Sequence, residues 1–193
     1  MIEEAGYGTS VKCDYNRSAG DVAVLRIPNV AGEVTSFNDM KYGRLSDAEL
    51  ARVTAHEGDL LVVRTNGSPD LVGRCAVVRD AKEPAAFASY LIRIRCKAGV
   101  DADYVQAMLR HLRVNGTLVD FARTTAGQYN VSLGRLRSAR LPLPPLAEQR
   151  RVVGYLHALS GKSHFLTKLQ DHRAAELDAV LPSILDRAFN GEL

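Results

Sequence analysis

The stretch PLPPLAEQRR, residues 142–151, separates two regions of this sequence that have different residue patterns. Residues that precede prolines are driven toward extended backbone, so the first half of the stretch predicts a stiff, extended connection. Pro145 suits the first position of a helix, where its missing N–H costs nothing, and Glu148 lies in the first turn, near the positive end of the helix dipole. The stretch therefore predicts a rigid strut that sets the direction of a helix.

The helix that follows is long. Residues 147–181 contain no proline, and a helix of this length extends about 50 Å at 1.5 Å per residue. Alternating steps of three and four residues give a seam typical of a coiled coil. The seam has polar positions at Ser163, Gln170 and Arg173, which can fix the register. Its apolar positions, the predicted helix interface, are Leu156, Leu159, Leu166, Leu177, Val180 and Ile184. We expect a partner helix from a second copy or another protein; the alternative is an amphipathic helix that packs on its own domain.

The region before residue 100 has a period of two residues, which is typical of half-buried strands. Strands are predicted at residues 22–27, 59–64, 74–79 and 88–97, with glycines and prolines between them to form turns. In the last of these strands an apolar series alternates with a basic series, which predicts an apolar inner face and a basic outer face. The two series are Tyr90, Ile92, Ile94, Cys96 and Arg93, Arg95, Lys97.

From residue 101 the apolar period lengthens to three and four residues, which predicts a helix capped by Asp101 or Asp103 and ended by Asn115-Gly116. Ser132 can cap one further helical turn. The predicted fold class is α+β. It comprises a sheet-rich domain over residues 1–145 and a long C-terminal coiled-coil helix, the spacer and dimerisation segment, over residues 146–193.

The charge is unevenly distributed. The formal net charge is only +3, but residues 110–151 hold eight arginines and two acids, a concentration that suits contact with nucleic acid. No apolar run approaches the roughly 20 residues of a membrane span, and the acidic N-terminus lacks a signal-peptide pattern. We therefore expect a cytoplasmic protein.

The motifs of common catalytic classes are missing. The sequence has no phosphate-binding loop, dinucleotide-binding turn, nucleophile elbow or zinc-protease helix. Pro144-Pro145 lies between leucines, so it cannot serve as the Asn-Pro-Pro-aromatic loop of a DNA amino-methyltransferase. The three cysteines, Cys13, Cys75 and Cys96, are widely spaced and form no C-x-x-C pair, which argues against a disulfide framework or a zinc site. We expect no catalysis, metal or cofactor in this chain.

Three polar stretches have the groups that contact DNA. Residues 6–12 offer hydroxyls, an aromatic ring and a cation to a phosphate. Residues 64–68 follow a strand and offer Arg and Asn, although Asn-Gly is equally typical of an ordinary turn. Residues 123–130 hold Arg, Gln and Asn, which make bidentate contacts to base edges, although a solvated loop remains the alternative. The predicted DNA contacts are Tyr7, Thr9, Ser10, Lys12, Arg64, Asn66, Arg74, Arg123, Thr125, Gln128 and Asn130. Of these, Thr9, Ser10 and Lys12 are expected to contact the DNA backbone and so position the protein.

An ordered set of segments runs through most of the chain and ends with Ser183–Leu193. The others are Tyr7–Ser10 with Lys12, Val24–Val30, Gly58–Val62, Leu71–Arg74, Tyr129–Leu133 and Pro142–Gln149. Together they resemble the specificity subunit of type I restriction-modification systems, as one target-recognition domain followed by its spacer helix.

The resemblance implies a subunit that catalyses nothing, reads a bipartite site in double-stranded DNA and carries two modification subunits. Those subunits methylate adenine with S-adenosylmethionine, and a motor-nuclease restriction subunit can join them. A full specificity subunit has two recognition domains and two antiparallel helices, whereas this sequence has one of each. We therefore expect either a half-subunit that forms a homodimer or the C-terminal half of a longer chain. The helix then acts as a spacer between half-sites about 34 to 36 Å apart.

Two other hypotheses remain open. One is the C-terminal recognition domain of a single-chain restriction-methyltransferase. The other is a coiled-coil adaptor that has no contact with DNA.

Overall fold

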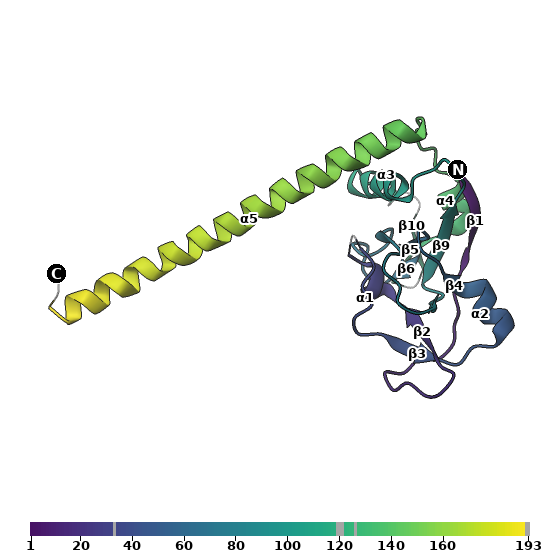
Figure 1. The fold of residues 1–193 in the computed structure, drawn as a ribbon, viewed down its shortest axis with the longest axis horizontal. Helices are drawn as coiled ribbons and strands as arrows, with labels where there is room; N and C mark the ends of the chain where they lie inside the picture. The colour runs from purple at the N-terminus through teal and green to yellow at the C-terminus, as the bar shows by residue number, and fades with distance from the viewer. Residues whose placement is uncertain (33, 119–121, 126, 192–193) are drawn as a thin grey trace. The chain divides into compact units, whose positions relative to one another are not determined.

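The computed structural model describes residues 1–32, 34–118, 122–125 and 127–191, without the side chains of residues 122–125 and 187. The chain divides into two units, Met1–Arg150 and Arg151–Leu193. The described residues of unit 1 form three sheets, and one long helix continues from its end through unit 2 (Figure 1). The mixture of sheets and helices with a long C-terminal helix confirms the predicted α+β class.

The central sheet of unit 1 has the order β1-β9-β5-β7 and only antiparallel pairs. Both of its faces are covered, which explains why all of β5 is apolar and buried. Leu60 and Val62 pack with α3 (Ala102–Val114), whereas Leu61 and Val63 pack with a second sheet. The strands are β1 (Ile2–Tyr7), β5 (Leu60–Val63), β7 (Cys75–Val77) and β9 (Leu91–Cys96).

The second sheet has the order β3-β2-β8-β4, and β2 and β8 are parallel. Its strands are β2 (Val22–Leu25), β3 (Lys41–Gly43), β4 (Thr54–Ala55) and β8 (Ala85–Phe87). The short helix α1 (Ile27–Val30) follows β2, and the short helix α2 (Asp47–Val53) precedes β4. The strand predicted at residues 22–27 ends at Leu25, because Pro28 in the first turn of α1 favours helical backbone there.

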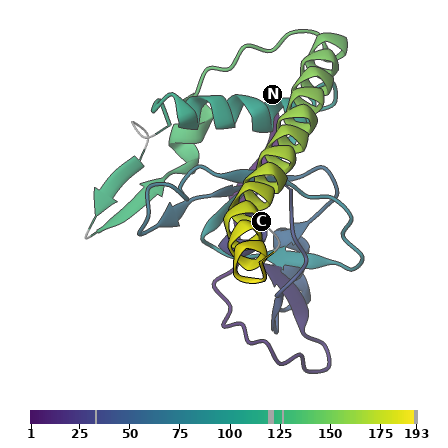
Figure 2. The same ribbon diagram turned by 90° about the vertical axis from the view of Figure 1, so that its left-hand side faces the viewer.

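The third sheet is small, with the order β10-β11-β6. Its strands are β6 (Thr65–Asn66), β10 (Ala122–Thr125) and β11 (Gln128–Val131). In Figure 2 the β10–β11 hairpin, drawn in green, extends outward at the edge of unit 1. Its short polar strands lack the apolar alternation that identifies strands from sequence, so they were not predicted.

The predicted helix caps are present. The Asp101 carboxylate accepts a 3.1 Å hydrogen bond from the Tyr104 amide and begins α3, and Asn115 ends it. Ser132 Oγ accepts a 3.2 Å bond from the Arg135 amide and begins α4 (Leu133–Ser138). These contacts confirm the prediction for Ser132 and identify Asp101 as the cap of α3.

The long helix α5 (Leu146–Phe189) has 44 residues and a length of about 66 Å at 1.5 Å per residue. It begins directly after Pro145, as predicted, and continues through Pro182 beyond the proline-free run. No helix in the described part of the chain is long and apolar enough to cross a membrane.

Gln149 holds the first turn of α5 within unit 1. Its side chain is 1% exposed, and its amide donates hydrogen bonds to the carbonyls of Pro144 at 2.7 Å and Gly99 at 3.3 Å. Its Oε1 accepts a 2.8 Å bond from the Asp101 amide, next to the start of α3. A buried glutamine therefore fastens the proline-rich stretch to the sheet domain.

The predicted basic outer face of β9 is wrong. Arg93 is 3% exposed, and its guanidinium forms an ion pair with Glu4 and donates a 2.7 Å bond to the Thr54 carbonyl. Arg95 is paired with Asp59. Alternation correctly separated the two faces of β9, but the second sheet covers the face that was expected to meet solvent.

Candidate nucleic-acid interface

The two stretches predicted around residues 64–68 and 123–130 meet on the third sheet. Asn130 lies opposite Thr65 and Tyr129 lies opposite Asn66. On the other side of β11, the backbone pairs place Arg123 opposite Asn130 and Thr125 opposite Gln128. The side chains of Arg123 and Thr125 lie outside the described part of the structure, so their DNA contacts stay predictions.

Strand alternation sets the two faces of β11. Val131 is buried and Tyr129 packs beside it against the core cluster that includes α3. Gln128 and Asn130 alternate with these residues and therefore face the opposite side. The core thus anchors one face of the hairpin and leaves amide side chains on the other.

Arg64 connects this sheet to β1. Its Nε donates a 3.3 Å hydrogen bond to Asn130 Oδ1, and its Nη1 donates a 3.4 Å bond to the Ser89 carbonyl. Its Cζ also lies 4.4 Å from the centroid of the Tyr7 ring, within the range of a cation–π contact. The Tyr7 hydroxyl accepts a 3.1 Å bond from the Leu133 amide. Arg64 therefore holds two other predicted DNA-contacting residues, Asn130 and Tyr7, in fixed positions beside it.

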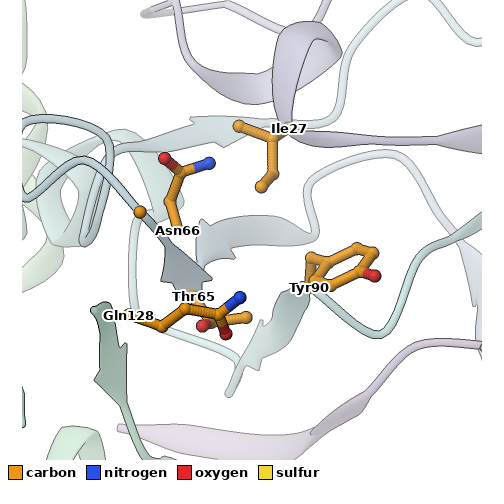
Figure 3. Close-up of a pocket in the computed structure, with 6 residues that line it drawn as sticks. Ile27, Thr65, Asn66, Tyr90 and Gln128 are labelled. Atoms are coloured by element: carbon orange, nitrogen blue, oxygen red, sulfur yellow. The ribbon is translucent and has the colours of Figure 1, made fainter. Parts of the chain in front are cut away.

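A cavity of about 220 Å³ opens beside β6. Figure 3 shows the Asn66 and Gln128 amides and the Tyr90 ring around one open space, with Ile27 above it. Thr65 and Gly67 complete the lining. The cavity therefore has an apolar wall and several hydrogen-bonding groups, a combination that suits the edge of a nucleic-acid base.

Sequence reasoning did not identify Ile27 or Tyr90 as part of this site, and Thr65 was included only as a member of the stretch 64–68. Tyr90 was assigned to the inner face of a strand, but it is 58% exposed and β9 begins only at Leu91. A tyrosine next to Ser89 at a strand boundary was an available signal. Ile27 carried none, because only the tertiary fold brings α1 beside β6.

The stretch around residues 6–12 has a different role. Thr9 is 2% exposed, its hydroxyl donates a 2.5 Å hydrogen bond to Glu49, and its amide donates a 2.8 Å bond to the Phe87 carbonyl. The Thr9 hydroxyl is therefore buried and engaged within the protein, and its predicted phosphate contact stays a prediction. Ser10 and Lys12 are exposed beside it, and their contacts stay predictions.

Arg74 is also held by the protein. Its Nε donates a 2.8 Å bond to the Asp70 carbonyl, and its Nη1 donates a 3.2 Å bond to the Ala31 carbonyl. The half-buried guanidinium thus joins two loops of unit 1, and Arg74 does not line the cavity. These contacts give Arg74 a structural role, and its predicted phosphate or base contact stays a prediction.

The predicted seam of α5 is exposed in the single chain. Its six apolar side chains are between 40% and 72% exposed, and Phe165 and Leu169 on the same helix are exposed as well. This row of apolar surface is what a partner helix requires, and the pairing itself stays a prediction.

The cysteines in this structure are free. Burial raises the pKa of the Cys75 thiol to about 12, so this side chain behaves as a small core residue. Among the described residues, no group of three or more His, Cys, Asp or Glu side chains is arranged to hold a metal ion.

No protein-family model matches this chain. It is 28% identical over 179 residues to the type I restriction enzyme EcoKI specificity subunit of Escherichia coli strain K12, an alignment that covers 92% of the chain and 39% of that relative. It is 24% identical over 181 residues to the type I restriction enzyme StySPI specificity subunit of Salmonella potsdam, covering 91% and 38%.

This chain is a homologue of type I specificity subunits. It spans about two-fifths of the length of these relatives. The HsdS subunit from Thermoanaerobacter tengcongensis superposes with a TM-score of 0.66 at 22% identity over 100% of this chain and 44% of that one. A chain from a study of type I R-M complex assembly and conformational transition superposes at 0.74 and 20% identity, over 98% and 44%. The specificity-subunit homologue therefore shares their fold.

Proposed function

We propose that this homologue is the DNA-reading component of a type I restriction-modification complex and recognises one half of a bipartite site. The observation that carries the proposal is the meeting of two predicted DNA-contacting stretches, far apart in sequence, on the sheet β10-β11-β6. Homology to specificity subunits supports the same function.

The shape of the third sheet suits this role. The major groove of B-DNA admits a two-stranded β-ribbon, and the β10–β11 hairpin is such a ribbon. Gln128 and Asn130 lie on the face opposite the core, and Arg64 lies beside them. The arginine-rich region of residues 110–151 supplies positive charge for phosphate contacts, which provide much of the affinity of DNA-binding proteins.

The long helix supplies the scaffold in this proposal. Two copies of α5 pair through the exposed seam in a homodimer, and the helices separate two recognition domains along the duplex. At about 66 Å, α5 is long enough to span half-sites about 34 to 36 Å apart.

Modification subunits bound to this scaffold carry S-adenosylmethionine and methylate adenine in the cytoplasm, and a restriction subunit can join. The present chain contributes recognition and no catalysis.

Methylome sequencing tests the proposal. Cells that express this chain with its modification subunit should gain adenine methylation at one defined, interrupted motif, and cells with the modification subunit alone should not. Because the dimer is symmetric, the two half-sites should be inverted copies of one sequence. Two unrelated half-sites would contradict self-pairing, and methylation without any motif would contradict recognition.

The exposed seam of α5 also favours a second candidate, an adaptor that pairs helices without touching DNA. Gel shifts of the purified complex on random duplexes over a salt series separate the two functions. A DNA reader loses affinity steeply as salt rises because it releases counterions from the phosphates. An adaptor shows no shift at any salt concentration.

A further inference from the structure

Three amide side chains gather on the third sheet, and their surroundings differ. Asn66, Gln128 and Asn130 all belong to residue types that read adenine by donating to N7 and accepting from N6. To read a base in this way, an amide needs both its oxygen and its nitrogen available. The hydrogen bonds of the three residues therefore separate a reader from the groups that position it.

Two of these amides have structural partners. Asn130 Oδ1 accepts the 3.3 Å bond from Arg64 Nε, so it fixes the guanidinium that stacks on Tyr7. Asn66 Oδ1 accepts a 2.8 Å bond from the Ser68 amide, which closes the turn after β6. In both residues the oxygen that adenine N6 would need already accepts a hydrogen bond from the protein and is held in place by it.

Gln128 is different. It is exposed, and no group in the described part of the chain hydrogen-bonds its amide. It directly follows Gly127, whose φ of 80° closes the β10–β11 turn, so it lies near the tip of the hairpin. It also lines the cavity whose wall includes Ile27 and Tyr90. Its amide is therefore presented near the tip of the ribbon.

We propose that Gln128 reads an adenine of the half-site through a bidentate contact in the major groove, and that Asn66 and Asn130 position the hairpin without reading bases. This inference rests on the proposed function, because it assigns a specificity-determining residue to the same interface. Each of the two roles predicts a different change in the methylated motif.

Methylome sequencing of the full chain with its modification subunit distinguishes the roles. Gln128→Ala should make one A·T position of each half-site degenerate, with discrimination there reduced about 5- to 150-fold, the value of one bidentate contact. Gln128→Glu should shift that same position toward C·G, because a carboxylate accepts from cytosine N4. The exposed side chain makes both variants compatible with folding, and an unchanged melting temperature checks this.

The matched controls are Asn130→Ala and Asn130→Asp. The alanine variant should lower methylation of every site with the motif unchanged, and aspartate, which can still accept from Arg64, should restore it. A wild-type motif in Gln128→Ala, or loss of a G·C position, would overturn the assignment while leaving the proposed function intact. If wild-type protein directs no motif at all, the proposed function fails and this inference falls with it.

Discussion

Strand β9 and helix α5 reverse the usual distribution of charged and apolar residues. Arg93 in β9 is 3% exposed, whereas Leu177 in α5 is 72% exposed. Neither position is unusual in its local pattern, because each lies in the periodic series expected of its element. The difference teaches that the pattern defines a face, while the surface that packs on that face decides whether it is buried.

In β9 that surface brings opposite charges. Glu4 from β1 pairs with both Arg93 and Arg95, and Asp59 accepts two 2.8 Å hydrogen bonds from Arg95. The hydrogen bonds that Arg95 donates to Asp59 raise the pKa of its guanidinium. A carboxylate within reach of each guanidinium therefore compensates its charge beneath the second sheet.

The exposed apolar side chains of α5 have no such packing partner within the described part of the chain. Tyr155, Phe165, Leu166 and Phe189 are all exposed by more than half. Isolated apolar side chains on a surface are ordinary, but a row of them along one helix indicates an interaction surface. The comparison therefore predicts that unit 1 is stabilised within the chain and α5 by a partner.

The largest expected effect is at the buried charges. Asp59→Ala removes a carboxylate that is 1% exposed and leaves Arg93 and Arg95 with less compensation, which should lower the free energy of unfolding by about 3 to 5 kcal/mol. Urea denaturation measures this. Glu83→Ala, which breaks an exposed ion pair with Arg17, is the control and should change the midpoint little. Equal effects of the two variants would remove the distinction between buried and exposed charge.

The next effect concerns the seam of α5. Leu166→Asp should raise the dissociation constant of the dimer at least about 100-fold, because two buried leucines are lost, each worth about 1.5 to 3 kcal/mol. Ala175→Asp places the same charge on the opposite side of the helix and should leave association unchanged. Sedimentation equilibrium measures both variants. A wild-type chain that stays monomeric at all concentrations would contradict the predicted partner.

The smallest effect compares one substitution in the two regions. A Cβ at Gly8 would lie 2.0 Å from the Phe87 carbonyl oxygen, so Gly8→Ala should destabilise unit 1 by about 1 to 3 kcal/mol. A Cβ at Gly161 meets nothing within 4 Å, and Gly161→Ala should raise helix stability by up to about 1 kcal/mol. Thermal melting followed by circular dichroism reports both. If the melting temperature changed in the same direction in both variants, packing would not distinguish the two regions.

Local chemistry was sufficient to predict several elements. Ser132 and Asp101 cap helices because a short polar side chain can satisfy amides two or three residues ahead. Pro145 and Glu148 define the start of α5 for similarly local reasons. The β1 strand was missed, because Glu3, Glu4 and Gly6 have low strand propensity and only pairing with β9 holds them extended.

The residue types of the candidate site could be predicted from the sequence, but the individual residues that form it could be predicted only in part. The amides and arginine of residues 64–68 and 123–130 were identified because their side chains match base edges and phosphates. Thr9 and Arg74 belong to the same residue types, but the structure uses their hydrogen bonds for packing. A sequence does not reveal which polar group a neighbouring segment will engage.

The sequence by itself determined the α+β class, the long helix with its apolar residues, and the residue types available for DNA contact. These features depend on local backbone preferences and on periodicity. Only the tertiary structure decided that Arg93 is buried, that Thr9 is engaged, and that Gln128 lines the cavity. Each of these depends on contacts between segments far apart in the chain, and the energy of a polar group is set by the partner that such a contact brings.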